Sequence, residues 1–399
     1  MIQTIVSNAS SPEYGQATIS FPIREEDYPN VVNVLQSMGL GEPLERDCRV
    51  DEVCGDWPIL KRLEKVAINL DEMDYLAKRL DSFGAQEKAK FQAAAVKFGL
   101  FDMRHLIDLT FCCQETTVIT DFSDLEKVGR RHFLDVNGGS ASSEELENVD
   151  GYETALLLIG DGDGTITPYG VIYDNGMQLR PVYDGQNFPL YQHQDAVLVL
   201  GLTHESDLDM NSATTWLFLP ASAERLERAL KRGGFEPGSS IHCTCVGGNI
   251  QEELEARLDF ERESLKDLNT FASAIASIDE AQHAKFKAVI QMANPQSAAE
   301  MAALAQNLDL FDFVPGVHSP KEYGEFMIRE SGHFDLDDDL APFIDYEAYG
   351  QKEINAEGGI FNEQGYVTYK GTQSLSELMR PLAEQKHAGS EMRMGGFSR

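Results

Sequence analysis

Acidic side chains gather in four runs along this chain, and carboxylates at such density can bind a cationic protein surface. One run opens a predicted helix, one follows a Gly/Ser turn, and two lie in the second half. We predict that these runs bind a partner, and their members are Asp71, Glu72, Asp74; Glu144, Glu145, Glu147, Asp150; Glu252, Glu253, Glu255, Asp259, Glu261, Glu263; and Asp335, Asp337, Asp338, Asp339. A solvated helix N-terminus explains any single run, but the abundance of acids in both halves favours a binding surface.

The net charge of −33 is far larger than solubility requires and is evenly divided. Residues 1–195 carry 33 acidic and 16 basic side chains, and residues 196–399 carry 33 and 17. Such a body repels nucleic acid and anionic membranes and attracts basic grooves, including those that hold DNA. Its charge equals that of roughly 56 Å of duplex, or about 16 base pairs. The alternative is a merely acidic cytosolic protein.

Two segments could hold a metal, and neither has a complete ligand set. Asp161-Gly162-Asp163-Gly164-Thr165 begins like a calcium loop, but positions five, six and twelve hold Thr165, Ile166 and Ile172. His242-Cys243-Thr244-Cys245 lacks a second ligand pair at zinc-finger spacing, and alternation on a strand makes both cysteines core residues. We therefore expect no metal and no cofactor.

No catalytic set emerges from the remaining residues. The chain has no nucleophile elbow, phosphate-binding loop or His-Glu-x-x-His motif. His132 and His193 have no obvious nucleophile beside them in the sequence. We expect a protein that is not an enzyme; a metal-dependent enzyme using Asp161 and Asp163 is the competing hypothesis.

The elements that must position the acidic runs recur at an offset of 195 residues. Ala89-Lys90-Phe91-Gln92-Ala93 returns as Ala284-Lys285-Phe286-Lys287-Ala288, and Gly39, Cys48, Leu70, Ala77, Gly129 and Gly170 return as Gly234, Cys243, Leu265, Ala272, Gly324 and Gly365. The predicted fold is α+β: two tandem related modules, each with small β-sheets flanking a helical bundle, in an elongated body. The expected domains are 1–192, 193–385 and a flexible tail, 386–399.

Within each module the pattern predicts two strands, a helix, a third strand, a helical middle and a closing hairpin. The expected strands are 4–6, 17–21 and 48–53 in the first module and 197–200, 215–219 and 241–246 in the second. Apolar spacing from Leu70 to Leu80 predicts one helix, and a further helix is expected over 122–133 with Ser123 as its cap. The hairpins are expected to pair 166–173 with 179–183, around Asp174-Asn175-Gly176, and Ile360 with 366–369.

Composition indicates a folded protein of the cytoplasm. Hydrophobic residues make up 42% of the chain, enough for real cores. The six cysteines show no secreted disulfide spacing, the N-terminus lacks the pattern of a signal peptide, and no apolar stretch is long enough to span a membrane.

The first half resembles the ArdA antirestriction proteins of mobile genetic elements. The resemblance is carried by Ile5-Val6-Ser7-Asn8, Tyr14-Gly15 and Phe21-Pro22, by the acid-rich strand 47–52, and by the segment 68–77, in which Asp74 stands at a common Asn position. It covers residues 1–150 well and 196–345 more weakly. This chain differs by carrying two copies with inserted hairpins and a less dense acidic pattern.

The resemblance implies an acidic mimic of B-form DNA that blocks type I restriction–modification enzymes. Its partner would be the basic DNA-binding groove of such an enzyme, with no direct binding to nucleic acid or membrane, and a homodimer is possible. Two alternatives stay open: a CRISPR effector as the target, and an acidic assembly scaffold as the function.

Overall fold

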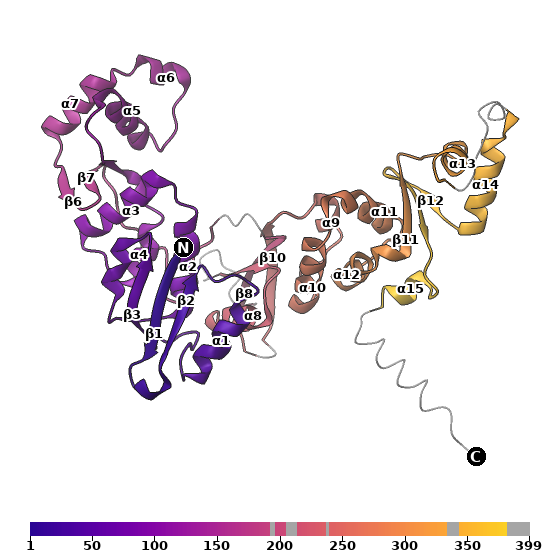
Figure 1. The fold of residues 1–399 in the computed structure, drawn as a ribbon, viewed down its shortest axis with the longest axis horizontal. Coiled ribbons are helices and arrows are strands. Elements are labelled where there is room, and N and C mark those ends of the chain that lie inside the picture. The colour runs from indigo at the N-terminus through magenta and orange to yellow at the C-terminus, as the bar shows by residue number, and fades with distance from the viewer. Residues whose placement is uncertain (192–195, 205–213, 237–238, 333–342, 381–399) are drawn as a thin grey trace. The chain divides into compact units, whose positions relative to one another are not determined.

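The computed structural model describes residues 1–191, 196–204, 214–236, 239–332 and 343–380 (Figure 1). Helices and small antiparallel sheets alternate along the chain, so the predicted α+β class is confirmed. The chain divides into two compact units. Unit 1 contains Met1–Gln192, Leu202–Leu217 and Ser222–Ile241, and unit 2 contains His193–Gly201, Phe218–Ala221 and His242–Arg399. None of the helices in the described ranges is long and apolar enough to cross a membrane.

Unit 1 opens with a four-stranded sheet in the order β2-β1-β3-β4, made of Gln16–Phe21, Ile2–Asn8, Cys48–Gly55 and Ala67–Ile68. Alternate residues of β1 and β2 are buried, as expected for strands with one face on a core. Helix α1 (Tyr28–Ser37) covers that face through its buried residues Val32 and Leu35.

A helical bundle follows, formed by α2 (Leu70–Asp81), α3 (Ala85–Phe98) and α4 (Met103–Leu109). It shares one continuous core with the first sheet. The predicted helix from Leu70 to Leu80 is confirmed, because its apolar residues recur at helical spacing on the core side. Trp57 packs edge-on against Phe91 of α3, with ring centroids 5.8 Å apart.

A second sheet closes the first half in the order β5-β7-β6, made of Thr116–Ile119, Gly170–Asp174 and Thr165–Thr167. Helices α5 (Leu125–Val136), α6 (Ser143–Asn148) and α7 (Gly151–Asp161) lie between its strands in sequence. The helix expected over 122–133 begins later than predicted, because Asp124 and not Ser123 accepts the N-capping hydrogen bond, from the Lys127 amide.

The predicted pairing of 166–173 with 179–183 is wrong. The hairpin forms earlier, with Ile166 opposite Val171. The expected turn does exist, since the Asp174 carboxylate accepts hydrogen bonds from the amides of Gly176 and Met177. Residues 179–183 form no strand. The Asp108 carboxylate instead accepts hydrogen bonds from the amides of Val182 and Tyr183.

The second half contains the same kinds of element. Its strands and helices are β8 (Leu198–His204), β9 (Thr215–Leu219), α8 (Ala223–Arg232), β10 (Ile241–Gly247), α9 (Glu252–Glu255), α10 (Leu265–Ala276), α11 (His283–Ala293), α12 (Ala298–Gln306), β11 (Phe311–Pro315), α13 (Pro320–Arg329), α14 (Tyr346–Glu357), β12 (Ile360–Phe361), β13 (Gly365–Tyr369) and α15 (Leu375–Leu378). Short 3₁₀ helices occupy Pro12–Tyr14, Pro58–Leu63, Cys113–Glu115, Glu280–Gln282 and Leu308–Leu310. The predicted hairpin of Ile360 with 366–369 is confirmed.

Strand pairings of the two halves correspond residue by residue. Thr116 lies opposite Asp174 in β5 and β7, and Phe311 lies opposite Tyr369 in β11 and β13, each 195 positions later. The sheet orders β5-β7-β6 and β11-β13-β12 match, as do β2-β1-β3 and β9-β8-β10. A shared register is what a duplicated sequence requires. The tandem arrangement stays a prediction, and this correspondence supports it.

Candidate functional site

The first acidic run lies at the N-terminus of α2, where its three carboxylates are buried. Asp71 is 8% exposed, and Glu72 and Asp74 are each 2% exposed. Asn69 starts the helix by accepting the amides of Asp71 and Glu72, and the helix dipole favours acids in this first turn. The expectation that this run lies exposed on a binding surface is therefore wrong, because the fold covers it.

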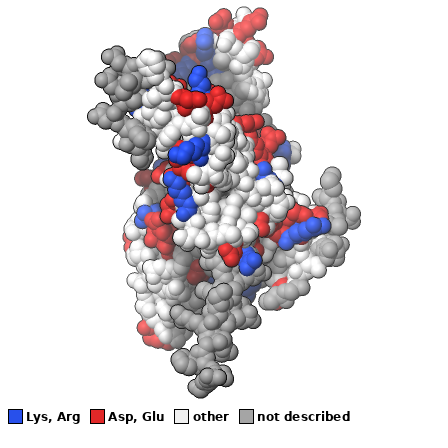
Figure 2. Space-filling view, turned by 90° about the vertical axis from the view of Figure 1, so that its right-hand side faces the viewer, with Lys and Arg blue, Asp and Glu red and all other residues white. Residues whose placement is uncertain are grey.

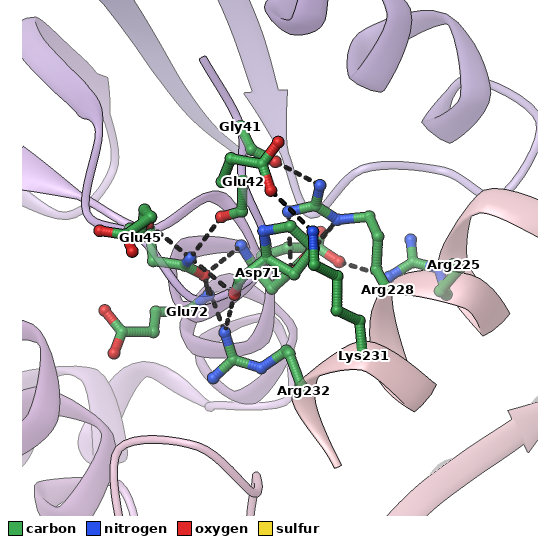
Figure 3. Close-up of polar contacts among 12 residues, drawn as sticks. Gly41, Glu42, Glu45, Asp71, Glu72, Arg225, Arg228, Lys231 and Arg232 are labelled. Atoms are coloured by element: carbon green, nitrogen blue, oxygen red, sulfur yellow. Dashed lines mark hydrogen bonds and ion pairs between the residues drawn. The ribbon is translucent and has the colours of Figure 1, made fainter. Parts of the chain in front are cut away.

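Arginines of α8 cover Asp71 and Asp74, and Arg46 pairs with Glu72 at 3.2 Å. Arg225, Arg228 and Arg232 are spaced to share one face of that helix, and all three point toward the α2 turn (Figure 3). The Arg228 guanidinium donates two hydrogen bonds to Asp71 Oδ2, from Nη2 at 2.9 Å and from Nε at 3.2 Å. Arg225 Nη1 lies 2.8 Å from Asp74 Oδ2. We call Asp71, Glu72, Asp74, Arg225, Arg228 and Arg232 the ion cluster.

Neighbouring polar groups add hydrogen bonds to the ion cluster. Tyr28 donates its hydroxyl to Asp71 at 2.6 Å, and Tyr183 donates to Glu72 at 3.1 Å. Arg232 donates to the Tyr183 oxygen at 2.6 Å and to the carbonyl of Pro43. The Asn69 amide also donates to the Pro43 carbonyl, at 2.9 Å. Buried charges are stable only when paired and hydrogen-bonded in this way.

Sequence reasoning missed the arginines. The available signal was their spacing, since three arginines share one face of a predicted helix in a chain with twice as many acidic as basic residues. Such a concentration of scarce cations indicates an acidic partner surface, which here lies within the same unit.

Asp74 has a local role that recurs in the second half. Its Oδ1 accepts the amide of Ile23 at 2.7 Å, and Asn269, 195 positions later on α10, accepts the amide of Ala221 at 2.8 Å. Asparagine can therefore fill this position sterically. Burial alone would raise the pKa of Asp74, but the opposite charges of Lys78 and Arg225 outweigh it and hold that pKa below its usual range.

We expect Asp74→Asn to lower the free energy of unfolding by about 1–3 kcal/mol at pH 7, because the charge-assisted bond to Arg225 is lost. A depressed folded-state pKa means that the carboxylate stabilises the fold fully above about pH 4, near its usual value of 3.8, and loses that effect as the pH falls further. The difference between wild type and variant should shrink below pH 4. Urea unfolding at several pH values measures it; a difference that stays constant down to pH 2 would contradict the assignment.

The second acidic run lies around α6 and α7 and is exposed. Glu145 and Ser142 form a capping box, and hydrogen bonds from Ser142 lower the pKa of the Glu145 carboxyl. Asp150 caps α7 by accepting the amide of Glu153 at 2.9 Å. Glu144 and Glu147 form no ion pair in the part of the chain that is described.

The third run begins in α9 and continues to the start of α10. Four of its members are exposed: Glu252, Glu253, Asp259 and Glu261. Glu255 and Glu263 are half-buried. Burial and the neighbouring carboxylates of Asp267, Asp259 and Glu300 raise the pKa of Glu263, although its Oε1 accepts the amide of Ala298 at 2.8 Å.

Basic side chains touch the edge of this third run at two points. Lys287 Nζ lies 3.5 Å from Glu253, and Arg262 lies 3.3 Å from Asp259. Figure 2 shows the same pattern on one face of the molecule, where Asp and Glu side chains form separate groups and some have Lys or Arg beside them. The fourth run, Asp335, Asp337, Asp338 and Asp339, lies outside the described residues.

Comparison with known protein families gives a match in the second half of the chain. The family model described as antirestriction protein (ArdA) matches residues 211–368. An ArdA antirestriction domain model thus covers the chain from β9 into β13. No curated protein matches the chain.

The ArdA match includes the exposed third run and the arginine helix α8. It lies on the half where the sequence resemblance was weaker. The first run, which lies in the segment 68–77 that carries part of the resemblance of the first half, contributes buried acids to unit 1 instead of an open surface.

The candidate metal ligands can be checked in the part of the chain that the structure describes. Among the described residues no three His, Cys, Asp or Glu side chains form a group able to hold a metal ion. Asp163 is exposed, and the side chain of Asp161 lies outside the description. In β10 Cys243 is buried and Cys245 half-buried, both as free thiols. Burial raises the pKa of Cys243 to about 11, so it is a neutral core residue at physiological pH.

Proposed function

We propose that this protein is a non-enzymatic inhibitor of a host DNA-binding defence enzyme, with type I restriction–modification as the target. The observation that carries the proposal is the ArdA match over residues 211–368, which contains an exposed acidic run. The inhibitor would act as a DNA mimic, with carboxylates in place of phosphates in the basic groove of the enzyme.

The physical case for mimicry rests on exposed carboxylates, two of which, Glu253 and Asp259, also pair with basic side chains. Glu252, Glu253, Asp259 and Glu261 project from α9 and the segment after it, and the net charge of the chain is −33. A basic groove releases the counterions it holds when polyanionic DNA, or an equivalent surface, binds. The α6–α7 run, Glu144, Glu145, Glu147 and Asp150, is the corresponding candidate surface of the first half. The carboxylates of the ion cluster are buried and paired with cations, so they are left out of this surface.

The test replaces the four exposed acids of the third run by amides: Glu252→Gln, Glu253→Gln, Asp259→Asn and Glu261→Gln together. A single exposed ion pair with the enzyme contributes little to the binding free energy, but these four carboxylates act together on one region of the groove. We expect affinity for a type I restriction enzyme to fall roughly ten- to hundredfold. Fluorescence anisotropy with labelled inhibitor measures the affinity, and unlabelled target duplex should compete for the same site.

A matched control removes the same charge from scattered exposed positions of the second half: Glu280, Asp309, Glu347 and Glu363, each changed to its amide. If binding is local, this control loses only a few-fold in affinity. Wild-type binding should also weaken steeply between about 50 and 300 mM salt, since both surfaces are screened. Equal losses in the two variants, or binding that duplex does not compete with, would refute DNA mimicry and leave the scaffold hypothesis.

A further inference from the structure

The ion cluster takes its acids from the first half of the chain and its three α8 arginines from the second half. At the positions of Arg225, Arg228 and Arg232, 195 residues earlier, α1 carries Asn30, Asn33 and Ser37. At the positions of Asp71, Glu72 and Asp74, 195 residues later, α10 carries Lys266, Asp267 and Asn269. The acids therefore belong to the helix of the first half and the arginines to the helix of the second, and the reverse pairing has no matching charges.

The acceptors around the N-terminus of α2 are arranged to bind guanidinium groups. Arg228 donates to both oxygens of Asp71 and to the carbonyl of Gly41, and Arg232 donates to the carbonyl of Pro43. Fixed carbonyls beside a carboxylate suit the planar fork of arginine better than the compact head of lysine. The Arg225 guanidinium also lies on the ring of Tyr28, 3.8 Å from its centroid.

Burial distinguishes this contact from an ordinary surface ion pair. Arg228 is 6% exposed and Arg232 is 4% exposed, although arginine is seldom buried. Their helix therefore packs against the rest of unit 1 through guanidinium groups, where most helices present an apolar stripe. Lys231, on the same helix, pairs with Glu42 at 2.9 Å while both remain more than half exposed.

We propose that the α2 turn with the loop at Gly41–Pro43 is a docking site for an arginine helix, and that its occupant is this chain's own α8. Because only one direction of pairing has complementary charges, the docking site fixes which half offers acids and which offers arginines. It also withdraws three arginines from the surface of an otherwise strongly acidic protein. A second copy of the chain, bound through an exchanged α8, is the other occupant that the site would accept.

The experiment is hydrogen exchange by mass spectrometry on the full chain, with Arg225→Gln, Arg228→Gln and Arg232→Gln combined. Arg225→Gln and Arg228→Gln remove the arginine partners of two buried carboxylates, those of Asp74 and Asp71. Arg232→Gln removes the donor to the Pro43 carbonyl and the Tyr183 oxygen. Together these losses strongly favour the undocked state. Amides of α8 should exchange at least about 100-fold faster than in the wild type. Amides of α3 and α11 should keep wild-type protection.

The matched control is Lys231→Gln, which removes one positive charge from the exposed side of the same helix. It should leave exchange in α8 within a few-fold of the wild type. A pair variant, Asp71→Asn with Arg228→Gln, should restore part of the protection that Arg228→Gln alone loses, since no uncompensated charge remains. This recovery identifies a direct pairing.

Several outcomes would overturn the proposal. Unchanged α8 exchange in the triple variant would show that the arginines do not hold the helix. Equal loss in α3 would show that they support the fold of the first half as a whole. Protection of α8 that rises with protein concentration, together with a dimeric mass in solution, would identify α8 of a second copy as the occupant in place of the chain's own.

Discussion

Gly324→Ala is expected to separate α13 from α14 and to lower the free energy of unfolding of unit 2 by on the order of 3 kcal/mol or more. The two helices cross so closely that an added Cβ would lie 1.9 Å from the Tyr346 carbonyl oxygen and 3.0 Å from the Gly350 amide nitrogen. Both obstacles are backbone atoms, so no side chain can turn aside. Urea unfolding, followed by far-ultraviolet circular dichroism, measures the loss.

The control is Gly160→Ala in α7, where an added Cβ meets nothing within 4 Å. Alanine at an open helical position stabilises by about 0.5–1 kcal/mol, because the unfolded chain loses freedom. Gly129→Ala in α5 should repeat the large effect, since its Cβ would lie 1.8 Å from the Gly151 oxygen. A cost below about 1 kcal/mol at both crossings would contradict the helix contact that the structure gives.

Those two glycines also show what the sequence could predict. Gly129 and Gly324 stand 195 positions apart, and each lies where two helix backbones meet. A shared residue marks the correspondence, but neither partner helix, α7 nor α14, was predicted. Their sequences have weak helical periodicity, because one side contacts a glycine and much of the rest is exposed.

The exposure of the acidic residues could be predicted only in part. An acid-rich segment does not reveal whether its carboxylates face water or pair with a guanidinium of a helix far away in the sequence. Asp71, Glu72 and Asp74 follow a strong N-cap, which predicts their helix correctly but is silent about Arg225 or Arg228, more than 150 positions away along the chain. Glu252 and Glu253 remain exposed, although Glu253 also pairs with Lys287 of α11.

In the closing segment of the first half, the turn was predicted correctly and the strand pairing after it was not. Asp174 and Gly176 form the turn that their types predict, but the chain beyond it does not return to β7. Tyr183 instead stacks on Phe188, at 5.2 Å between ring centroids, and Phe188 stacks on Tyr75 of α2 at 4.6 Å. Aromatic burial against a helix outweighs one more pair of strand hydrogen bonds, and local turn chemistry cannot reveal that.

A buried ion pair in the repeated motif gives the last expected result. Lys90 of α3 reaches Asp135 of α5 at 2.7 Å, and the side chain of each is only 4% exposed. Lys90→Met should cost about 3–5 kcal/mol of unfolding free energy, because it leaves the carboxylate buried without its closest cation. Denaturant titration of the full chain measures this cost against the wild type.

The repeat supplies the matched control. Lys285 stands at the equivalent position of α11, but the equivalent acid, Glu330, is exposed. Lys285→Met removes the same charge without stranding a buried carboxylate, so it should change stability by less than about 1 kcal/mol. Adding Asp135→Leu to Lys90→Met should recover most of the loss, since a buried pair can be replaced by apolar groups at little cost. Equal costs for the two lysine variants would mean that Asp135 does not depend on Lys90. A larger loss of unfolding free energy for Lys90→Met than for Lys285→Met would show that the two corresponding halves are stabilised by different ion pairs.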